Sequence, residues 1–320
     1  MTTSGALETS GAIERLRRII STELTPLVDR DFRYLMMTEH GNVGDTMIFQ
    51  GERDFLATIP FRCKEWTTMS SFSTRHPPVP ENDLLVFRGS GSFGDLWPVA
   101  PTFWLDILRR YPRNPVLFMP QTAHFENDAK LKELARAFER PGRTVVCLRD
   151  RPSFDLVQSR FNCETFLVPD MAFFMDMGRW TSRRVARNGR RLLIRRTDRE
   201  ANESPFLRSL LNRDDIDSSD WPTMSQSHPA QRWMSRIQRR TRRCPRLFDF
   251  FVRRFYRPAI LRAGIRFVEP YEEIYATRMH GGILSLLLGK PTTFFDNSYG
   301  KTAAVFETWL SGCGNAQLIR

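Results

Sequence analysis

The sequence predicts an α/β protein with two mostly parallel sheets, one in each half of the chain. Apolar runs of strand length alternate with segments of helical periodicity, and glycine-rich turns follow several of these runs. A stretch rich in Gly, Arg, Ser and Asn at 175–190 marks a linker between the halves. A chain of 320 residues that is 41% hydrophobic is long enough for two domains of ordinary size. We expect one domain at 1–180 and a second at 190–320.

The net charge of +12 predicts attraction to polyanions, which include nucleic acid, anionic membrane surfaces and phosphorylated substrates. The five cysteines are scattered and form no close pair, so we expect a reducing compartment and no structural metal. Residues 1–11 lack the basic start and apolar core of a secretory signal, and no apolar run reaches the roughly 18 residues of a membrane-spanning helix. The sequence therefore indicates a cytoplasmic protein that is at most peripheral to a membrane.

Two glycine-rich loops each follow a predicted strand in the first half. After an amphipathic helix at 12–24, the strand at 32–38 runs into the loop 39–46, and the strand at 83–87 runs into the loop 88–95; a helix follows each loop. Such a loop can present backbone N–H groups to a phosphate or carboxylate, although the same residues also suit ordinary tight turns. The candidate binding residues of these loops are Gly41, Asn42, Gly44, Asp45, Gly89, Ser90, Gly91 and Ser92.

Further strands are predicted at 115–119 and 144–148, and a helix follows each of them. A fifth apolar segment at 166–174, interrupted by Pro169 and Asp170, completes the first half. His124 and Arg149 come after the strands at 115–119 and 144–148. Because the carboxyl ends of parallel strands meet at one edge of a sheet, we expect both side chains on the same face as the glycine-rich loops. They are candidates for acid/base chemistry and for anion binding.

The second half begins with a strand at 191–194, and the polar, acidic stretch that follows to Ser225 is expected to be a solvated loop without chemistry. Residues 228–257 are rich in Arg and aromatic residues, with Asp249 as the only acid. Such a segment can lie on an anionic membrane or follow a phosphate backbone. The alternative is a solvated helix face whose Arg stems cover apolar surface. A strand at 265–268 and a closing helix at 301–310 complete the predicted elements.

The segment 275–296 carries the most informative chemistry. Its order of strand, polar elbow, helix and strand is the crossover unit of a parallel sheet. Arg278 and His280 occupy the elbow, where the free N–H groups of the helix favour an anion, and Gly281 and Gly282 would let a ligand approach the backbone. The alternative is a buried His beside an Arg that caps a loop. An Arg, a His and paired glycines together favour the functional interpretation.

Taken in order, these motifs resemble the polysaccharide pyruvyl transferase family over residues 34–296. Each motif alone is common, whereas the ordered set is specific. Ser92 stands where close relatives are expected to carry Asn, and Met279 replaces a more usual Leu. The matching segments are Gly41-Asn-Val-Gly-Asp45, Gly89-Ser-Gly-Ser-Phe-Gly-Asp95, Pro120-Gln-Thr-Ala-His-Phe125, Arg149-Asp-Arg-Pro-Ser153, Pro169-Asp170, and Arg278-Met-His-Gly281 with Gly289-Lys-Pro291.

The resemblance implies both a fold and a reaction. The fold would be two Rossmann-like domains facing across a cleft that holds the site, similar to the GT-B glycosyltransferases. The reaction would move pyruvate from phosphoenolpyruvate onto a sugar of an exopolysaccharide or cell-wall polymer precursor as a ketal, without a metal or cofactor. Arg149 and Arg278 would bind the anionic groups of the donor, because guanidinium groups bind such groups bidentately. His280 would be the principal acid/base, with His124 a second candidate that could instead orient the acceptor.

Two other functions compete with this one. A nucleotide-sugar glycosyltransferase would have the same two-domain shape, and Glu269 or Glu273 could bind its ribose. A nucleic-acid-binding protein would use the Arg-rich segment at 232–257 but would leave the glycine loops and His280 unexplained, so we expect no nucleic-acid partner. For an acceptor sugar on a lipid diphosphate, the Arg-rich segment would instead hold the enzyme at the inner face of the membrane or contact the diphosphate.

Overall fold

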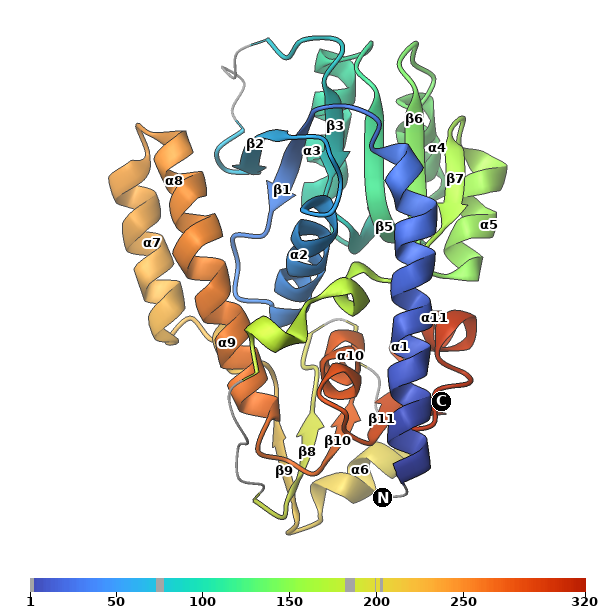
Figure 1. Ribbon diagram of the computed structural model, residues 1–320, viewed down its shortest axis with the longest axis vertical. Helices are drawn as coiled ribbons and strands as arrows, with labels where there is room; N and C mark the ends of the chain where they lie inside the picture. Colours follow the sequence, from blue (N-terminus) through green and yellow to red (C-terminus); the bar gives the residue numbers. More distant parts are fainter. Residues whose placement is uncertain (1–2, 73–77, 182–187, 199, 202–203) are drawn as a thin grey trace.

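The computed structural model of the protein describes residues 3–72, 78–181, 188–198, 200–201 and 204–320. Strands and helices alternate along the chain and form two sheets, whose strands all pair in parallel within the described residues (Figure 1). The α/β class and the parallel pairing that the alternating pattern predicts are therefore confirmed. The predicted linker at 175–190 lies in part, at 182–187, outside the described residues.

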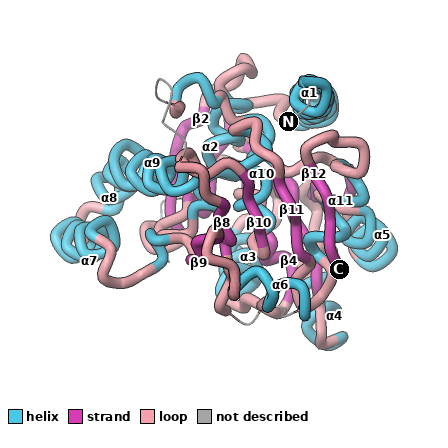
Figure 2. Tube along the Cα trace, turned by 90° about the horizontal axis from the view of Figure 1, so that it is seen from below, coloured by secondary structure: helices cyan, strands magenta, loops and turns pink. Residues whose placement is uncertain are grey.

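The first sheet has seven strands in the order β2-β1-β3-β5-β6-β7, with β4 paired to β5 as well. The second has five strands in the order β12-β11-β10-β8-β9, which Figure 2 shows from below. The strands are β1 (Phe32–Met37), β2 (Cys63–Thr68), β3 (Leu84–Phe87), β4 (Ser90–Gly94), β5 (Val116–His124), β6 (Thr144–Leu148), β7 (Glu164–Leu167), β8 (Arg191–Ile194), β9 (Ile216–Ser219), β10 (Glu273–Ala276), β11 (Thr292–Phe295) and β12 (Ala316–Ile319).

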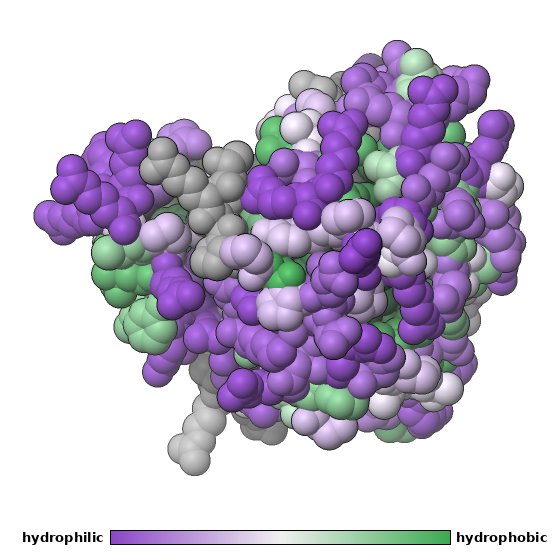
Figure 3. Space-filling view, turned by 90° about the horizontal axis from the view of Figure 1, so that it is seen from above, coloured by the Kyte–Doolittle hydropathy of each residue, from purple (hydrophilic) through white to green (hydrophobic). Residues whose placement is uncertain are grey.

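Most helices pack against these sheets, whereas α7 and α8 project to one side, where α8 contacts the edge strand β2 (Figures 1 and 3). A π-helical turn at Val252–Tyr256 joins α8 to α9. No helix in the described part of the chain combines the length and the apolar character needed to cross a bilayer. The helices are α1 (Thr3–Leu24), α2 (Val43–Leu56), α3 (Val99–Arg110), α4 (Asp128–Arg136), α5 (Arg151–Arg160), α6 (Pro205–Leu211), α7 (Pro229–Thr241), α8 (Pro245–Phe251), α9 (Arg257–Val268), α10 (Met279–Leu287) and α11 (Lys301–Trp309).

The glycine-rich segment predicted as the loop 88–95 is largely a strand. β3 pairs with the first part of β5, and β4 pairs with its last part, from Ser90 opposite Gln121 to Gly94 opposite His124. A side chain at Gly94 would lie 1.7 Å from the carbonyl oxygen of His124. Gly94 therefore permits close strand pairing. The loop prediction was wrong because glycine is common in turns, whereas here it allows two strands to approach each other.

The structure corrects three other expectations. The predicted strand at 265–268 is the last turn of α9, in which the buried Leu261, Ile265 and Val268 recur at helical spacing. The apolar segment at 166–174 is a strand only as far as Leu167, because Asp170 caps a short 3₁₀ turn by accepting the N–H of Ala172. The stretch 195–225 is not only a solvated loop, since it contains α6 and β9.

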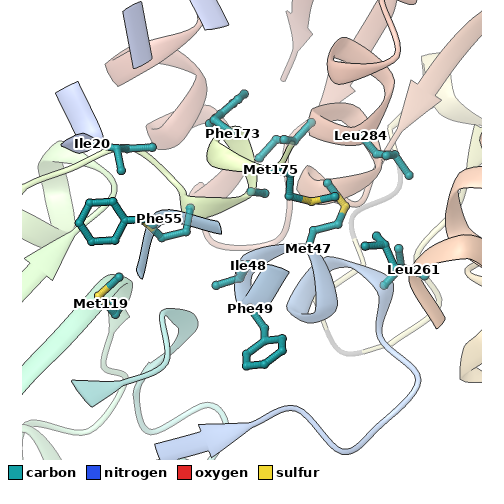
Figure 4. Close-up of a cluster of buried hydrophobic side chains, with 14 of the residues drawn as sticks. Ile20, Met47, Ile48, Phe49, Phe55, Met119, Phe173, Met175, Leu261 and Leu284 are labelled. Carbon is teal, nitrogen blue, oxygen red and sulfur yellow. The ribbon is translucent and has the colours of Figure 1, made fainter. Parts of the chain in front are cut away.

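One hydrophobic core joins the two sheets. Helix α2 lies near its centre, and Met47 of α2 belongs to the same buried cluster as Met119 of β5, Leu261 of α9 and Leu284 of α10 (Figure 4). Helix α1 runs along both sheets (Figure 1). At its first turns the hydroxyl of Thr9 accepts the N–H of Asn315, next to β12, at 3.1 Å. Burial of apolar surface therefore ties the two halves together directly.

Candidate active site

Arg149 and His280 meet where elements of the two halves come together. Arg149 follows β6, and its Nη1 lies 2.5 Å from Asp170 Oδ2. The same oxygen lies 3.1 Å from Nε2 of His280, in the first turn of α10. The side chains of Arg149 and Asp170 are each 1% exposed, whereas that of His280 is 15% exposed. Asp170 thus links a guanidinium of the first half to a partly accessible imidazole of the second.

Asp170 is held in its ionised form. Burial by itself would raise the pKa of this carboxyl, but the charges of His280 and Arg149 and the hydrogen bond with His280 lower the pKa well below its usual range. Its other oxygen caps the 3₁₀ turn. An ionised carboxylate in this position orients the imidazole of His280 and fixes the guanidinium of Arg149.

Two glycines allow these side chains to approach the neighbouring backbone. A methyl group at Gly44, in the first turn of α2, would lie 2.8 Å from Cβ, Cγ and Nδ1 of His280. A methyl group at Gly91, in β4, would lie 3.0 Å from Nη2 of Arg149 and 3.4 Å from Nζ of Lys301. The two glycine-rich segments predicted from the sequence therefore do converge on Arg149 and His280, one on each residue.

The first glycine-rich turn is organised by its own contacts. Asn42 caps α2 by accepting the N–H of Gly44 at 2.9 Å, so this N–H is used within the turn. Gly41 packs against the second half of the chain, where its carbonyl accepts the hydroxyl of Thr223 at 2.6 Å. Asp45 lies at the start of α2. Burial would raise its pKa, but Arg88 and other neighbouring cations lower it to about 2.

The second glycine-rich segment is also hydrogen-bonded internally. The N–H of Gly89 donates to Glu52 at 2.6 Å, and the hydroxyl of the buried Ser90 donates to Gln121 at 2.7 Å. The N–H of Ser92 donates to Ser90 Oγ at 3.1 Å. These bonds hold β4 in place beside β5, so the segment positions Gly91 rather than offering a row of free N–H donors.

Lys301 is a site residue that the sequence prediction missed. It opens α11, is buried, and donates to Glu200 at 2.6 Å. Burial lowers the pKa of Lys301 to about 8, although Glu200 acts in the opposite direction. Burial would raise the pKa of Glu200, but Lys301 and Arg196 lower it to about 2. The sequence did contain a signal for Lys301. This residue follows a predicted strand and a glycine, and the predicted site residues Arg149 and Arg278 also follow strands.

Among the residues that the structure describes, the side-chain hydrogen bonds of Arg278 are with acidic residues of the second half and not with Arg149, Asp170 or His280. Its guanidinium makes two contacts with Asp220, one of them 2.6 Å long, and a third with Asp198 at 3.3 Å. The residue is 4% exposed. Both carboxylates lie in the stretch to which the sequence assigned no chemistry, so Asp220 is a second residue that was missed. The paired guanidinium fixes the elbow before α10.

The two glycines after His280 serve helix packing. A methyl group at Gly281 would lie 2.8 Å from Ile194, and one at Gly282 would lie 2.1 Å from the ring of Phe294. Both neighbours belong to strands of the second sheet. The expectation that these glycines let a ligand reach the backbone is therefore wrong, because they let α10 lie close to the sheet instead.

His124 lines a cavity that is next to the Arg149 cluster. The cavity has a volume of about 780 Å³ and lies between the end of β5 and the start of α5 on one side and α11 on the other. The ring of His124 stacks on Tyr299 with 4.3 Å between centroids, and Lys301 also lines the cavity. His280 is not among the lining residues. Lys301 is thus shared between the cavity and the Arg149 cluster.

Among the arginines of the Arg-rich segment, Arg257 belongs to the interior. Arg257 is 3% exposed and donates to the carbonyl oxygens of Thr38 at 2.6 Å and Asp45 at 3.3 Å. Burial lowers its pKa to about 9. Arg88 Nη1 lies 3.7 Å from Asp45 on the same turn. Arg257 therefore supports the first glycine-rich turn, whereas the sequence placed it on a surface.

The acids that favoured a nucleotide-sugar site lie elsewhere. Glu273 begins β10, at the amino end of the strand, and pairs with Arg191 at 2.8 Å. Glu269 follows α9 as its C-terminal cap, and its carbonyl accepts Nζ of Lys290. Ligands of open α/β sheets bind outside the carboxyl ends of the strands, so neither residue is placed to hold a ribose there.

Comparison with known proteins finds one family over most of the chain. The family described as polysaccharide pyruvyl transferase matches residues 42–299. The Bacillus subtilis (strain 168) protein named "Putative pyruvyl transferase EpsO" is 30% identical over 285 residues, which cover 88% of this chain and 86% of that protein. Pyruvyl transferase 1 of Schizosaccharomyces pombe (strain 972 / ATCC 24843) is 26% identical over 86% of this chain and 68% of its own length.

A solved structure shares the fold. It is the crystal structure of a functionally uncharacterized protein from Klebsiella pneumoniae subsp. pneumoniae NTUH-K2044, with a TM-score of 0.66 and 20% sequence identity, and the match covers 95% of this chain and 98% of the other. The mixed α/β architecture with parallel sheets is consistent with a Rossmann-like arrangement. With its ordered motifs and a family match across both sheets, the chain belongs to the polysaccharide pyruvyl transferase family.

Proposed function

We propose that this protein transfers pyruvate from phosphoenolpyruvate to a saccharide as a ketal. The observation that carries the proposal is the oxygen of Asp170 that Arg149 and His280 share, since it brings an anion-binding group and an acid/base group to one point. The donor has a carboxylate and a phosphate, so it needs more than one cation. We propose that Arg149 and Lys301 are the cations that bind the carboxylate and the phosphate of the donor, because both side chains lie close to Gly91.

The reaction balances with groups that the chain supplies. Two hydroxyl oxygens of the saccharide form bonds to the enol carbon of the donor, and the bond from that carbon to the phosphate oxygen breaks. One hydroxyl proton ends on the methylene carbon, which becomes a methyl group, and the other ends on inorganic phosphate. His280 moves the first proton, oriented by Asp170. The cations offset the charge of the departing phosphate, and the steps require neither a metal nor an organic cofactor.

The cavity beside Lys301 suits the saccharide acceptor. Its volume of about 780 Å³ lies within the usual range of ligand sites, and polar side chains surround the ring of Tyr299. We assign His124, which stacks on Tyr299, to acceptor orientation. In this proposal the halves act as two Rossmann-like domains that face across a GT-B-like cleft, and the cavity is part of that cleft.

The test is an incubation of the purified protein with phosphoenolpyruvate and a panel of saccharide acceptors. We expect inorganic phosphate to appear together with an acceptor whose mass has gained one pyruvyl group. Arg149→Gln should abolish both signals, whereas Arg160→Gln, which removes an exposed arginine at the end of α5, should leave them unchanged. Transfer of a sugar from a nucleotide sugar, with no phosphate released from phosphoenolpyruvate, would contradict the proposal.

A further inference from the structure

We propose that α7, α8 and the π-helical turn form a docking surface for an anionic lipid membrane. We call residues 229–256 the basic lobe. The lobe projects from the body of the protein, and from above it is mainly hydrophilic with a hydrophobic patch (Figures 1 and 3). The patch and the surrounding cations together indicate the kind of partner.

The cations of the lobe face solvent. Arg232, Arg236, Arg239 and Arg240 recur at helical spacing along one side of α7, and all are exposed. None of them makes an ion pair with a residue that the structure describes. The inward side of α7 carries Met234 instead. The lobe thus presents a continuous row of uncompensated positive charge.

The single acid of the lobe is turned inward. Asp249 is buried and accepts the N–H of Thr68, at the end of β2, at 2.9 Å. Burial raises its pKa to about 6. The carboxylate therefore anchors α8 to the first sheet and does not offset the charge of the outer surface, which remains attractive to anions.

Large apolar side chains on the lobe are exposed beside these cations. Leu247, Phe250 and Phe255 are 50%, 47% and 44% exposed. Phe250 and Phe255 lie with their ring centroids 6.1 Å apart, and Arg254 lies over Phe255 at 5.7 Å. Leu247 precedes Phe250 by three positions, about one helical turn. These residues form an apolar patch that is bordered by arginines.

A lipid surface satisfies both features at once. Arg side chains bind the phosphates of anionic headgroups, while half-exposed Phe and Leu enter the boundary between headgroups and acyl chains. A nucleic-acid backbone would satisfy the arginines, but it would leave the apolar patch in water. An acidic protein surface would bind the arginines, but it has no hydrocarbon layer into which the exposed Phe and Leu side chains could insert. The combination therefore favours a membrane.

The lobe is connected directly to the candidate active site. Buried Arg257 follows the exposed Phe255 by two positions and donates to the carbonyl oxygens of Thr38 and Asp45. Arg253 lies over the ring of Trp66 in β2 at 5.8 Å. Docking would consequently set the first glycine-rich turn at a fixed position relative to the lipid surface. The docking surface itself does not rest on the reaction proposed above, because its test measures no reaction.

The test is sedimentation of the full-length protein with phosphatidylcholine vesicles that contain phosphatidylglycerol. The triple variant Arg236→Ser, Arg239→Ser, Arg240→Ser should bind about 100-fold more weakly, since each basic residue near an anionic surface contributes about fivefold. The variant Leu247→Ser, Phe250→Ser, Phe255→Ser should bind more weakly by about tenfold or more, because apolar insertion is lost. Vesicles of phosphatidylcholine alone should bind poorly.

Matched variants control for total charge and apolar content. Arg15→Ser, Arg18→Ser, Arg136→Ser removes three exposed arginines from α1 and α4, and Leu7→Ser, Val99→Ser, Leu211→Ser removes three exposed apolar side chains elsewhere. Both should bind vesicles as the unaltered protein does. The proposal is overturned if the lobe variants retain binding, if the controls lose it equally, or if a duplex oligonucleotide competes fully with the vesicles at equal phosphate concentration.

Discussion

Asp170 Oδ2 accepts from Arg149 and contacts His280, which come from opposite halves of the chain. Removing one member of a buried charged group leaves the others unpaired, so each of the three depends on the other two. Residue-scale experiments should therefore separate chemistry from stability.

Replacement of His280 should affect the chemical step more than replacement of His124. We expect His280→Gln to lower kcat by about 10²–10⁴-fold, the usual contribution of a positioned acid/base group. His124→Gln should mainly raise KM for the saccharide, because His124 lines the cavity beside Tyr299. Steady-state kinetics with both substrates varied would check this, with circular dichroism to confirm folding. The opposite pattern would make His124 the acid/base.

Donor binding should weaken as the pH rises through about 8. The pKa of Lys301 is lowered to about 8 by burial, so its ammonium group is present below that pH and is lost above it. Glu200 raises this pKa, and Glu200→Gln should therefore move the alkaline limb of kcat/KM for phosphoenolpyruvate to lower pH. Lys301→Arg should move it to higher pH, since a guanidinium stays charged. If the alkaline limb of the pH profile moves in neither variant, the titration of Lys301 is not its cause.

At the scale of elements, close packing decides where the chemical groups lie. Helix α10 carries His280 and rests on the second sheet, with Gly282 against Phe294 of β11. Helix α2 carries Gly44 against His280 from the other side. The imidazole of His280 thus lies between the first turns of α2 and α10. Gly44 and Gly282 allow this close packing because they have no side chain.

A methyl group should have opposite effects at two helical glycines. Gly282→Ala should destabilise the protein by about 1–3 kcal/mol, because its Cβ would lie 2.1 Å from the buried Phe294 ring. Gly11→Ala, in α1, should stabilise it by about 0.5–1 kcal/mol, since no atom lies within 4 Å of that Cβ and alanine favours helix. Denaturant unfolding measures both. Equal effects would show that helix propensity alone governs Gly282.

At the scale of the whole molecule, the largest buried cluster spans both sheets, while two further clusters each pack against one sheet alone. Residues of α2, α9 and α10 belong to the same buried cluster (Figure 4). Helix α1 also contacts the segment before β12. The boundaries at 1–180 and 190–320 remain a prediction about folding units. A shared core predicts that neither unit unfolds alone.

Thermal unfolding should therefore occur in one transition. Leu261→Ala, in α9, should lower the free energy of unfolding by about 2–5 kcal/mol, the usual cost of a cavity in a core. The variant should shift the single calorimetric peak without splitting it. A fragment of residues 188–320 should lack a cooperative transition. Two resolved peaks, or a fragment that unfolds cooperatively, would show that the halves are independent.

The sequence alone determined the α/β class, most strands of both sheets and the convergence of Arg149, His280 and two glycine-rich segments. These follow from local periodicity and from the rule that parallel strands end at one edge. It also identified the motifs that match the family. The strands and the individual motifs depend on residues near one another in the chain.

Only the tertiary structure decided what each polar group does. Arg278 is paired with Asp220, Arg257 lies inside, and Lys301 joins Arg149, although local sequence does not distinguish these four cations. Partners separated by tens or hundreds of positions determine which charge is neutralised and which is left for a ligand. Spacing in the sequence does not encode that, because it depends on how the two sheets pack around their shared core.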